Sequence, residues 1–589
     1  MWTRGALTRG RRFVLVMATL VAVGAPGPAQ GNQRDATMSG AVGGAPMVGM
    51  TRRLRSGMPA QLDLWSPGRS LIGLPYFIAV DVQNDMSLGL PLALPGEPGA
   101  VALTSTLVPL VNTFAGGAGA LGLPSSGMQI TIPIPSSSRA GTVVFQAAVA
   151  DPVALNGYAV TPITGGRLGV IPTLTPIFAT TIVLGQFGYS THPADLDGDG
   201  LPEIIAGARK DNGTIPTTGR VYVYDGVTGV QLFVLDDPSP DADSEFGVSV
   251  STGDVNGDGQ VDIVVGARES TYNPGMVMDA GQVVVFFGPD YSTTYTIDPV
   301  LPEIDGRFGH RTICADFDGD GFTDLAVSST GATVSGVIKA GRIDVFYGPS
   351  LSPGLIVDNP SPGDTDRFGY RFCAEDLDDD GFDELVVATP FKELIAGTDD
   401  ESGAIYVLAG PSFTVRNYFP NPFPSVSGLL GADVSCRDLD GDGDVDIIAG
   451  AELDDSGGLA GQGSVWLLYG PDFTTTLQVF APVPEIDAGF GSGCDAGDFD
   501  QDGIMDLMVG EFHYSGPAFR TGRAHILYGP DYLTGETVEE PITGSNYQFG
   551  RRIRAADLDG DGDAEMVVGV PQSSASGGSR AGAVWIVEN

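Results

Sequence analysis

The apolar residues downstream of residue 170 fall into short runs that polar turns interrupt at a nearly constant interval. Val283–Phe287 is one such run, and Ile263–Val265 is another. Short runs bounded by Gly and Pro are typical of strands, and runs without polar alternation are typical of strands covered on both faces. The pattern predicts an all-β protein built from several small, stacked sheets.

A repeated unit underlies these runs. Each unit opens with Phe-Gly or a close variant and continues through a strand, an acidic loop, a second strand that often ends in Gly-Ala, and two further strands. The third strand commonly ends in Gly-Pro, a turn signal. Seven units of four strands predict a seven-bladed β-propeller, in which sheets pack around a central axis. The openings are Phe187-Gly188, Phe246-Gly247, Phe308-Gly309, Phe368-Gly369, Leu430-Gly431, Phe490-Gly491 and Phe549-Gly550.

The two ends of the repeat array indicate how the ring closes. The last unit stops after its third strand, Val584–Val587, so its fourth strand is missing. An unassigned strand, Phe178–Leu184, precedes the first Phe-Gly. We expect this strand to complete the seventh blade, because an open array would need no such exchange.

The region upstream of the repeats divides into three parts. Residues 1–29 are typical of a secretory signal, with clustered arginines, the short apolar run Phe13–Ala25 and small residues up to Ala29. This run is too short to span a membrane. The sequence therefore predicts a soluble protein that is secreted and extracellular.

Residues 30–55 lack periodicity and are interpreted as a linker. Residues 56–165 carry strand-like runs between turn signals and predict a small β-sandwich-like domain of unknown role. Residues 170–589 hold the propeller. The runs in the small domain are Leu71–Val80, Gln129–Ile134 and Val143–Ala150.

The acidic loop is the part of the unit that points to chemistry. Acidic or amide side chains stand at positions 1, 3, 5 and 9 of the loop, and glycine stands at position 6. Oxygens at positions 1, 3 and 5 of a tight loop converge, position 7 can offer its carbonyl, and position 9 adds a carboxylate. Calcium takes six to eight oxygen ligands in such a tolerant geometry. The predicted ligands, loop by loop, are Asp195, Asp197, Asp199 and Glu203; Asp254, Asn256, Asp258 and Asp262; Asp316, Asp318, Asp320 and Asp324; Asp376, Asp378, Asp380 and Glu384; Asp438, Asp440, Asp442 and Asp446; Asp498, Asp500, Asp502 and Asp506; and Asp557, Asp559, Asp561 and Glu565.

Other interpretations of the loop explain less of it. Asp-Gly pairs favour hairpin turns, but a turn does not need four polar residues at fixed offsets. An EF-hand closes with Glu at position 12 between helices, whereas here an acid at position 9 leads into a strand. Magnesium prefers stricter octahedral geometry, and zinc prefers His or Cys ligands, which the loops lack.

The net charge of -43 narrows the class of partner. Seven bound calcium ions would still leave a charge of about -29, counting the ordinary charge of each ion. Such a surface repels nucleic acid and anionic lipid, so neither is expected as a partner.

The cysteines Cys314, Cys373, Cys436 and Cys494 all lie just before an acidic loop, on equivalent strands. Side chains alternate along a strand, and by this parity Cys373 faces opposite to the other three. Cys373 could therefore pair with Cys314 or with Cys436, whereas Cys436 and Cys494 should not meet. Four unpaired, buried cysteines are the alternative.

The Phe-Gly openings, the Gly-Ala segments and the acidic loops together resemble FG-GAP repeats. These repeats form the seven-bladed propeller of integrin α subunits and of many bacterial secreted proteins. The resemblance covers residues 170–589 and implies calcium loops on one face of the propeller. All seven loops match here, whereas integrins carry them in only some blades. The full Gly-Ala-Pro is rarely kept, since Arg209 and Arg268 replace the proline and the last unit reads Gly569-Val570-Pro571.

Three functions fit these features. The leading hypothesis is a calcium-binding adhesion module that contacts an extracellular protein or glycan, of unknown identity, on the face opposite the acidic loops. The second is a propeller hydrolase or polysaccharide lyase, although no nucleophile motif is present and each histidine has a structural explanation. The third is a lectin-like propeller in which Trp466 or Trp585 stacks on sugars. The four histidines are His192, His310, His513 and His525.

Overall fold

The computed structural model separates the chain into two compact units, Met1–Ile171 with Asn589, and Pro172–Glu588. The structure describes the strands of the first unit by their backbone. In the second it describes residues 173–177 and 185–589, except 214, 273–275, 396–399, 425–426, 516–518, 541–546 and 575–579. All elements in these described parts are strands, as the sequence predicts. Nothing in them forms a helix of the length and apolar character that a membrane span requires.

The first unit contains two sheets. The larger follows the order β3-β10-β8-β1-β5-β6, with β9 beside β8, and the smaller follows β2-β4-β7. β1 coincides with the apolar run of the predicted secretory signal, and that signal and the sandwich stay predictions. The strands are β1 (Val14–Ala22), β2 (Val48–Gly49), β3 (Leu54–Arg55), β4 (Pro59–Leu64), β5 (Tyr76–Gln83), β6 (Val108–Asn112), β7 (Met128–Pro133), β8 (Gly141–Ala150), β9 (Tyr158–Val160) and β10 (Thr164–Gly169).

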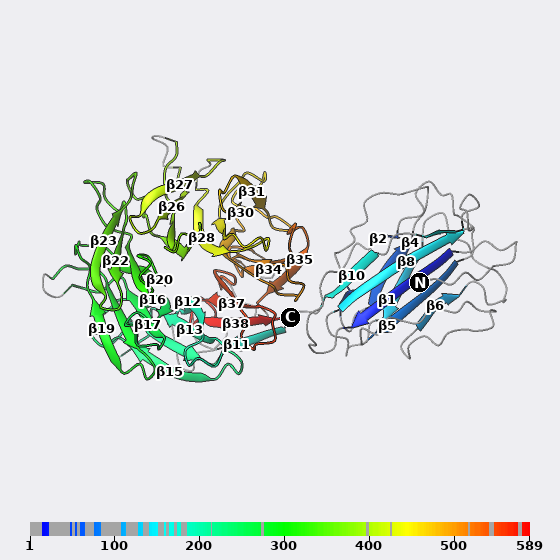
Figure 1. Cartoon of the computed structure of the whole chain (residues 1–589), viewed down its shortest axis with the longest axis horizontal. Helices are drawn as coiled ribbons and strands as arrows, with labels where there is room; N and C mark the ends of the chain where they lie inside the picture. Colours follow the sequence, from blue (N-terminus) through cyan, green and yellow to red (C-terminus); the bar gives the residue numbers. More distant parts are fainter. Residues whose placement is uncertain are drawn as a thin grey trace. The chain divides into compact units, whose positions relative to one another are not determined.

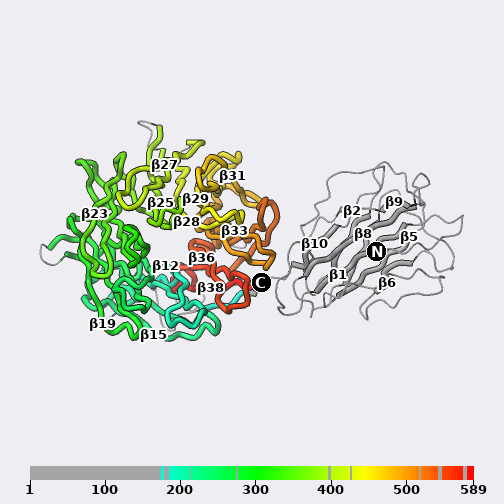
Figure 2. The backbone as a smooth tube through the Cα atoms, in the orientation of Figure 1, coloured from blue at the N-terminus to red at the C-terminus, as the bar shows by residue number. Residues whose placement is uncertain are grey.

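The second unit is a seven-bladed propeller in its described residues, which confirms the prediction. Its four-stranded antiparallel sheets follow one another around a ring in sequence order (Figures 1 and 2). The blades are β12 (Phe187–Ala194) to β15 (Gln231–Asp236), with β13 (Glu203–Ala208) and β14 (Arg220–Tyr224); β16 (Phe246–Gly253), β17 (Asp262–Ala267), β18 (Gln282–Phe287) and β19 (Thr293–Ile297); β20 (Phe308–Ala315), β21 (Asp324–Ser329), β22 (Arg342–Tyr347) and β23 (Ser352–Asp358); β24 (Arg371–Glu375), β25 (Glu384–Thr389), β26 (Ala404–Ala409) and β27 (Thr414–Pro420); β28 (Leu430–Arg437), β29 (Asp446–Ala451), β30 (Ser464–Tyr469) and β31 (Thr475–Val479); β32 (Phe490–Gly497), β33 (Asp506–Glu511), β34 (Arg523–Leu527) and β35 (Gly535–Glu539); and β36 (Arg552–Ala556), β37 (Glu565–Val570), β38 (Ala583–Glu588) and β11 (Thr173–Ile177).

Burial along each blade explains its hydrophobic pattern. All residues of the second strand are buried, as in β17 and β29, because neighbouring blades cover both faces of the sheet. The fourth strand lies at the rim and is largely exposed, as in β23. The continuous apolar runs therefore mark the middle of each blade, where side chains from adjacent blades interdigitate.

The Phe-Gly openings join neighbouring blades. Phe246 is fully buried, and its backbone forms a parallel bridge with Gly219 of the preceding blade. The same bridge recurs at each junction, including Phe187 with Gly582, which joins the first blade to the last. The motif is thus a blade-to-blade connection, and its large side chain fills the wedge between two sheets.

The closing strand lies earlier in the chain than the sequence predicts. β11 (Thr173–Ile177), and not Phe178–Leu184, pairs antiparallel with β38 (Figure 1). The predicted segment lies outside the described residues. Pro176 is tolerated in β11 because this strand forms the outer edge of its sheet, where one side needs no backbone donor. A strand from before the first blade completes the last blade, as expected, but the prediction of which residues form this strand was wrong.

Candidate metal centres and the central channel

Each acidic loop connects the first strand of a blade to the second, so the seven loops in the described residues share one face of the propeller. Position 9 is the first residue of the second strand and is buried in every loop, as Asp262 and Glu384 show. Positions 3 and 5 of the first loop, Asp197 and Asp199, are exposed. Each loop therefore offers a buried carboxylate below an open cluster of acids.

Backbone N–H groups hold the acidic side chains of the first loop in place. The two carboxylate oxygens of Asp195 accept hydrogen bonds from the N–H groups of Gly198, at 2.8 Å, and Gly200, at 2.9 Å. Asp199 accepts one from Leu201 at 2.9 Å. Equivalent bonds recur in the other loops, for example from Gly321 to Asp316 at 2.9 Å. The side chains are thus preorganised by the backbone turn.

The position 9 carboxylate ties the loop to the blade. In all seven described loops it accepts a hydrogen bond from the N–H of position 2, as Asp262 does from Val255 at 3.1 Å. Its second oxygen often accepts from the glycine of the Gly-Pro turn, as with Gly288 at 2.9 Å. Position 9 therefore has a structural role as well as a possible ligand role.

Carboxylate oxygens converge in these loops as a hard cation requires. In at least five of the described loops, oxygens from three or four acids lie within 4.8 Å of one another. The cluster of the seventh loop also includes Asp563, which sequence reasoning assigned only as a backbone ligand position. In the second loop, Asn256 instead donates a hydrogen bond to Asp258 at 3.1 Å. The oxygen-only donor set fits a divalent cation such as calcium.

Burial and neighbouring carboxylates raise the pKa values of several position 9 acids. Burial, reinforced by neighbouring carboxylates, raises the pKa of Asp262, Asp324 and Asp446 to about 6 and that of Asp506 to about 7. Burial and Asp563 raise the pKa of Glu565 to about 8. A bound cation would offset this concentration of negative charge.

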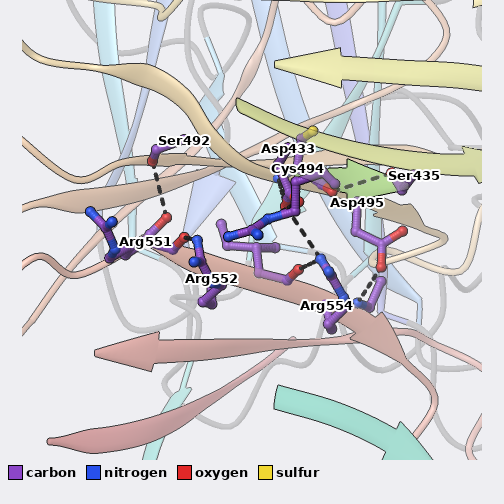
Figure 3. Close-up of polar contacts among 12 residues, drawn as sticks. Asp433, Ser435, Ser492, Cys494, Asp495, Arg551, Arg552 and Arg554 are labelled. Atoms are coloured by element: carbon purple, nitrogen blue, oxygen red, sulfur yellow. Dashed lines mark hydrogen bonds and ion pairs between the residues drawn. The ribbon is translucent and has the colours of Figure 1, made fainter. Parts of the chain in front are cut away.

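The first strands of the blades line the central channel and carry charges that sequence analysis did not single out. Asp433, fully buried, lies 3.4 Å from Arg554 and 3.5 Å from Arg371, which come from two other blades. Arg437 pairs with Asp495 at 3.2 Å. Figure 3 shows Arg554 directed toward Asp433. These pairs join residues on different blades, so no local pattern indicated them.

The cysteines follow the parity argument. Cys373 and Cys436 form a disulfide, with their Cα atoms 6.2 Å apart, and this selects one of the two predicted pairings. Cys314 and Cys494 are free. The disulfide links the first strands of two adjacent blades.

The histidines and tryptophans do not assemble a recognisable catalytic site in the described residues. His525 is buried, and its Nε2 lies 2.8 Å from Glu511, but no surface reaches the pair. His310 is also buried. Trp585 is buried, as expected for a third strand, whereas Trp466 is half-buried and packs beside the exposed ring of Phe423.

Comparison with known proteins defines the class. The FG-GAP repeat family matches residues 246–286, 308–346, 368–408 and 549–587, and the FG-GAP-like repeat family matches residues 195–265 and 438–509. The matched segments lie in the blades and include the acidic loops. The second unit is therefore an FG-GAP propeller of the integrin alpha type.

Individual relatives agree with this class. The chain is 30% identical over 282 residues to integrin alpha pat-2 of Caenorhabditis elegans, covering 44% of this chain and 21% of the relative. It is 31% identical over 223 residues to human integrin alpha-IIb, covering 34% and 20%. It is 30% identical over 274 residues to integrin alpha-5 of Xenopus laevis, covering 43% and 24%. The chain thus spans about a fifth to a quarter of the length of these relatives.

Proposed function

We propose that the chain is an exported, calcium-stabilised propeller that binds an extracellular protein or glycan, as an adhesion module. The integrin alpha names of its relatives support this class of function. The disulfide supports export, because structural disulfides persist mainly in oxidising compartments.

The observation that carries the proposal is an uneven distribution of exposed apolar side chains. The loops between strands two and three, and between strand four and the next blade, form what we name the opposite face. Among the described residues, eleven large apolar side chains are exposed there, compared with four on the acidic-loop face, Val227, Val230, Phe322 and Leu533. Contiguous exposed apolar patches mark binding surfaces, and the uneven distribution makes the opposite face the better candidate for such a surface. Those on the opposite face are Met276, Met278, Val300, Leu301, Ile304, Ile338, Ile395, Phe423, Val483, Ile486 and Phe519.

The acidic loops then have a supporting role. The proposed ligands of calcium are the side chains at positions 1, 3, 5 and 9 of each loop. Calcium bound there would neutralise the carboxylates and stiffen the connection between the first two strands of each blade. The opposite face, at the other end of these strands, would gain a rigid scaffold.

Melting the full chain in calcium, in magnesium and in EDTA tests the metal assignment. A site with a dissociation constant of about 0.1 mM adds about 1.4 kcal/mol in about 1 mM calcium. Seven such sites would add about 10 kcal/mol if they act independently. Asp258→Asn should remove part of this gain, whereas Asp290→Asn, which changes an exposed aspartate outside the loops, should not. Equal melting in calcium and EDTA would contradict the assignment.

The binding role is tested separately with arrays of extracellular matrix proteins and glycans. Ile304→Ser on the opposite face should weaken a captured interaction, whereas Leu533→Ser on the acidic-loop face should leave it unchanged. Glycan-only capture that depends on Trp466 would favour the lectin function. Turnover of a glycan or ester, abolished by one substitution outside the acidic loops, would favour the enzyme.

A further inference from the structure

A pocket of about 120 Å³ opens on the opposite face where the first blade meets the seventh. Its walls come from the Phe-Gly openings of these two blades and from the residues that follow their second strands. Almost all of the lining is polar, which is unusual for a pocket between apolar blades. The polar lining residues are Gln186, Tyr189, Arg209, Gln548, Arg551 and Gln572.

Internal hydrogen bonds leave this lining rich in donors. The side-chain oxygen of Gln186 accepts a hydrogen bond from Arg209 Nε at 2.8 Å. The side-chain oxygen of Gln548 accepts one from Gln572 Nε2 at 2.9 Å. The amide nitrogens of Gln186 and Gln548 therefore remain as donors beside the Arg551 guanidinium.

Positive charge surrounds Tyr189 in the wall of the pocket. Arg209 stacks on its ring, with the guanidinium carbon 3.7 Å from the ring centroid, and Arg552 lies 5.3 Å away. Burial raises the pKa of Tyr189, but Arg209, Arg268, Arg552 and Arg551 outweigh burial and lower it to about 6. The electrostatic potential at the pocket is thus strongly positive in a chain whose net charge is -43.

The acids near the pocket do not neutralise all of these cations. Glu245 is shared among Arg209, at 3.0 Å, Arg268, at 2.7 Å, and Lys210, at 2.8 Å. Among the described residues, no carboxylate forms an ion pair with Arg551 or Arg552.

Arg552 is buried and, among the described residues, donates to carbonyl oxygens, those of Tyr189 at 3.1 Å and of Arg551 at 3.0 Å. Glu452 acts on both arginines from beyond ion-pair distance, and burial raises its pKa. Figure 3 shows the contrast, since Arg554 is directed toward Asp433 while Arg551, just before β36, lies apart from it. Arg552 does not line the pocket but lies 5.3 Å from the Tyr189 ring, so its charge adds to that of Arg551, for which an oxyanion would supply a counter-ion.

We propose that this pocket binds a small oxyanion of the sulfate or phosphate class, held by Arg551, the Tyr189 hydroxyl and the amides of Gln186 and Gln548. Guanidinium groups bind such oxyanions through paired hydrogen bonds. The pocket volume suits one acidic group, and the net charge of the chain repels polyanions. The site is independent of the adhesion role and of the metal loops.

Sulfate is the probe, because its charge is constant over the pH range of interest. We expect sulfate to bind the full chain saturably by calorimetry, and to raise its melting temperature above that in potassium chloride of equal ionic strength. Arg551→Gln should weaken sulfate binding at least tenfold. The matched control is Arg520→Gln, because Arg520 likewise stacks on a phenylalanine, at 5.2 Å from Phe519 compared with 4.9 Å from Phe512 for Arg551. Arg520 lies outside the pocket, so this variant should bind as the wild type does.

A pH series separates this site from nonspecific ion binding. The Tyr189 phenolate and the oxyanion compete for the same positive charge, so sulfate should bind more tightly at pH 6 than at pH 8. Tyr189→Phe should abolish that pH dependence and weaken sulfate binding at pH 6, because the variant has lost both the titrating group and one hydrogen-bond donor. Phosphate in place of sulfate tests the class. Equal effects of sulfate and chloride, or unchanged binding in Arg551→Gln, would overturn the proposal.

Discussion

Glycines in this repeat serve two different physical needs. Gly259, at position 6 of its loop, has a φ of +86°, and an added Cβ would meet no atom within 4 Å. Gly266, in the Gly-Ala segment, has ordinary backbone angles, but an added Cβ would overlap the carbonyl oxygen of Gly309 in the next blade. The first glycine permits a local turn, and the second permits two blades to approach each other.

This difference predicts unequal effects of alanine. Gly259→Ala should lower the free energy of unfolding by about 1 kcal/mol, the usual penalty of a left-handed alanine. Gly266→Ala should lower it by about 3 kcal/mol or more, because two packed backbones must separate. Denaturant unfolding in saturating calcium measures both. If the two variants lose the same free energy of unfolding, the close approach of neighbouring blades does not explain the glycine at position 266.

The burial of His310 predicts that the free energy of unfolding depends on pH. Burial, followed by the charges of Arg268, Arg371, Arg307 and Arg367, lowers the pKa of His310 well below its usual value. The folded state then keeps His310 neutral while the unfolded chain takes up a proton below about pH 6.5. The contribution of His310 to stability is therefore complete above that pH and is lost as the pH falls.

The variant His310→Gln isolates this effect. Below about pH 6.5, the free energy of unfolding of the wild type should fall relative to that of the variant by about 1.4 kcal/mol for each pH unit. Urea unfolding at several pH values measures it, and other titrating groups cancel in the difference. A constant difference between pH 7.5 and pH 5 would be inconsistent with a neutral, buried His310.

At the scale of elements, the ring depends on β11, a strand separated from its partner β38 by the whole propeller sequence. Ile177 is 2% exposed and packs with Phe187, Val584 and Ile586, which belong to the first and last blades. Ile177→Ala should therefore lower the free energy of unfolding by about 2 to 5 kcal/mol. Ile356→Ala on the exposed strand β23 is the control and should cost less than about 1 kcal/mol. Similar losses in both variants would mean that closure contributes little.

The disulfide is a second connection between elements. Cys373 and Cys436 are 63 residues apart in the sequence, so the bond restricts a long loop of the unfolded chain. Replacing both with alanine should lower stability by about 4 kcal/mol on the loop-entropy model. A reducing agent should destabilise the wild type similarly and leave the double variant unchanged. Insensitivity of the wild type to reduction would contradict the pairing.

The whole molecule carries a charge of -43, much of it in loops that share one face. Without calcium, repulsion among these loops opposes folding. Raising the ionic strength from about 0.1 M to 1 M shortens the screening length from about 10 Å to 3 Å. Melting temperature should therefore rise with potassium chloride in EDTA, and rise less in calcium. A salt effect of equal size in both conditions would exclude loop repulsion as its source.

Much of the fold was readable because the repeat is encoded locally. Phe-Gly openings, apolar strands and Gly-Pro turns each reflect the geometry of a few neighbouring residues, and repetition multiplies a weak signal. The acidic loops were readable for the same reason, since their acidic side chains lie within nine residues of one another, as from Asp254 to Asp262. Alternation of side chains along adjacent strands limited Cys373 to Cys314 or Cys436, and only the structure selected Cys436.

Other features depend on contacts between residues that are far apart in the sequence. The choice of Thr173–Ile177 over the next apolar segment as closing strand depends on its register with β38, because both segments have strand character. The Asp433–Arg554 pair joins two blades, and the pocket combines Tyr189 of the first blade with Arg551 of the last. These groups carry no local signature, because only the packing of different blades brings them together. The sequence therefore specified the blades and their loops, and the packing of blade against blade created the channel and the pocket.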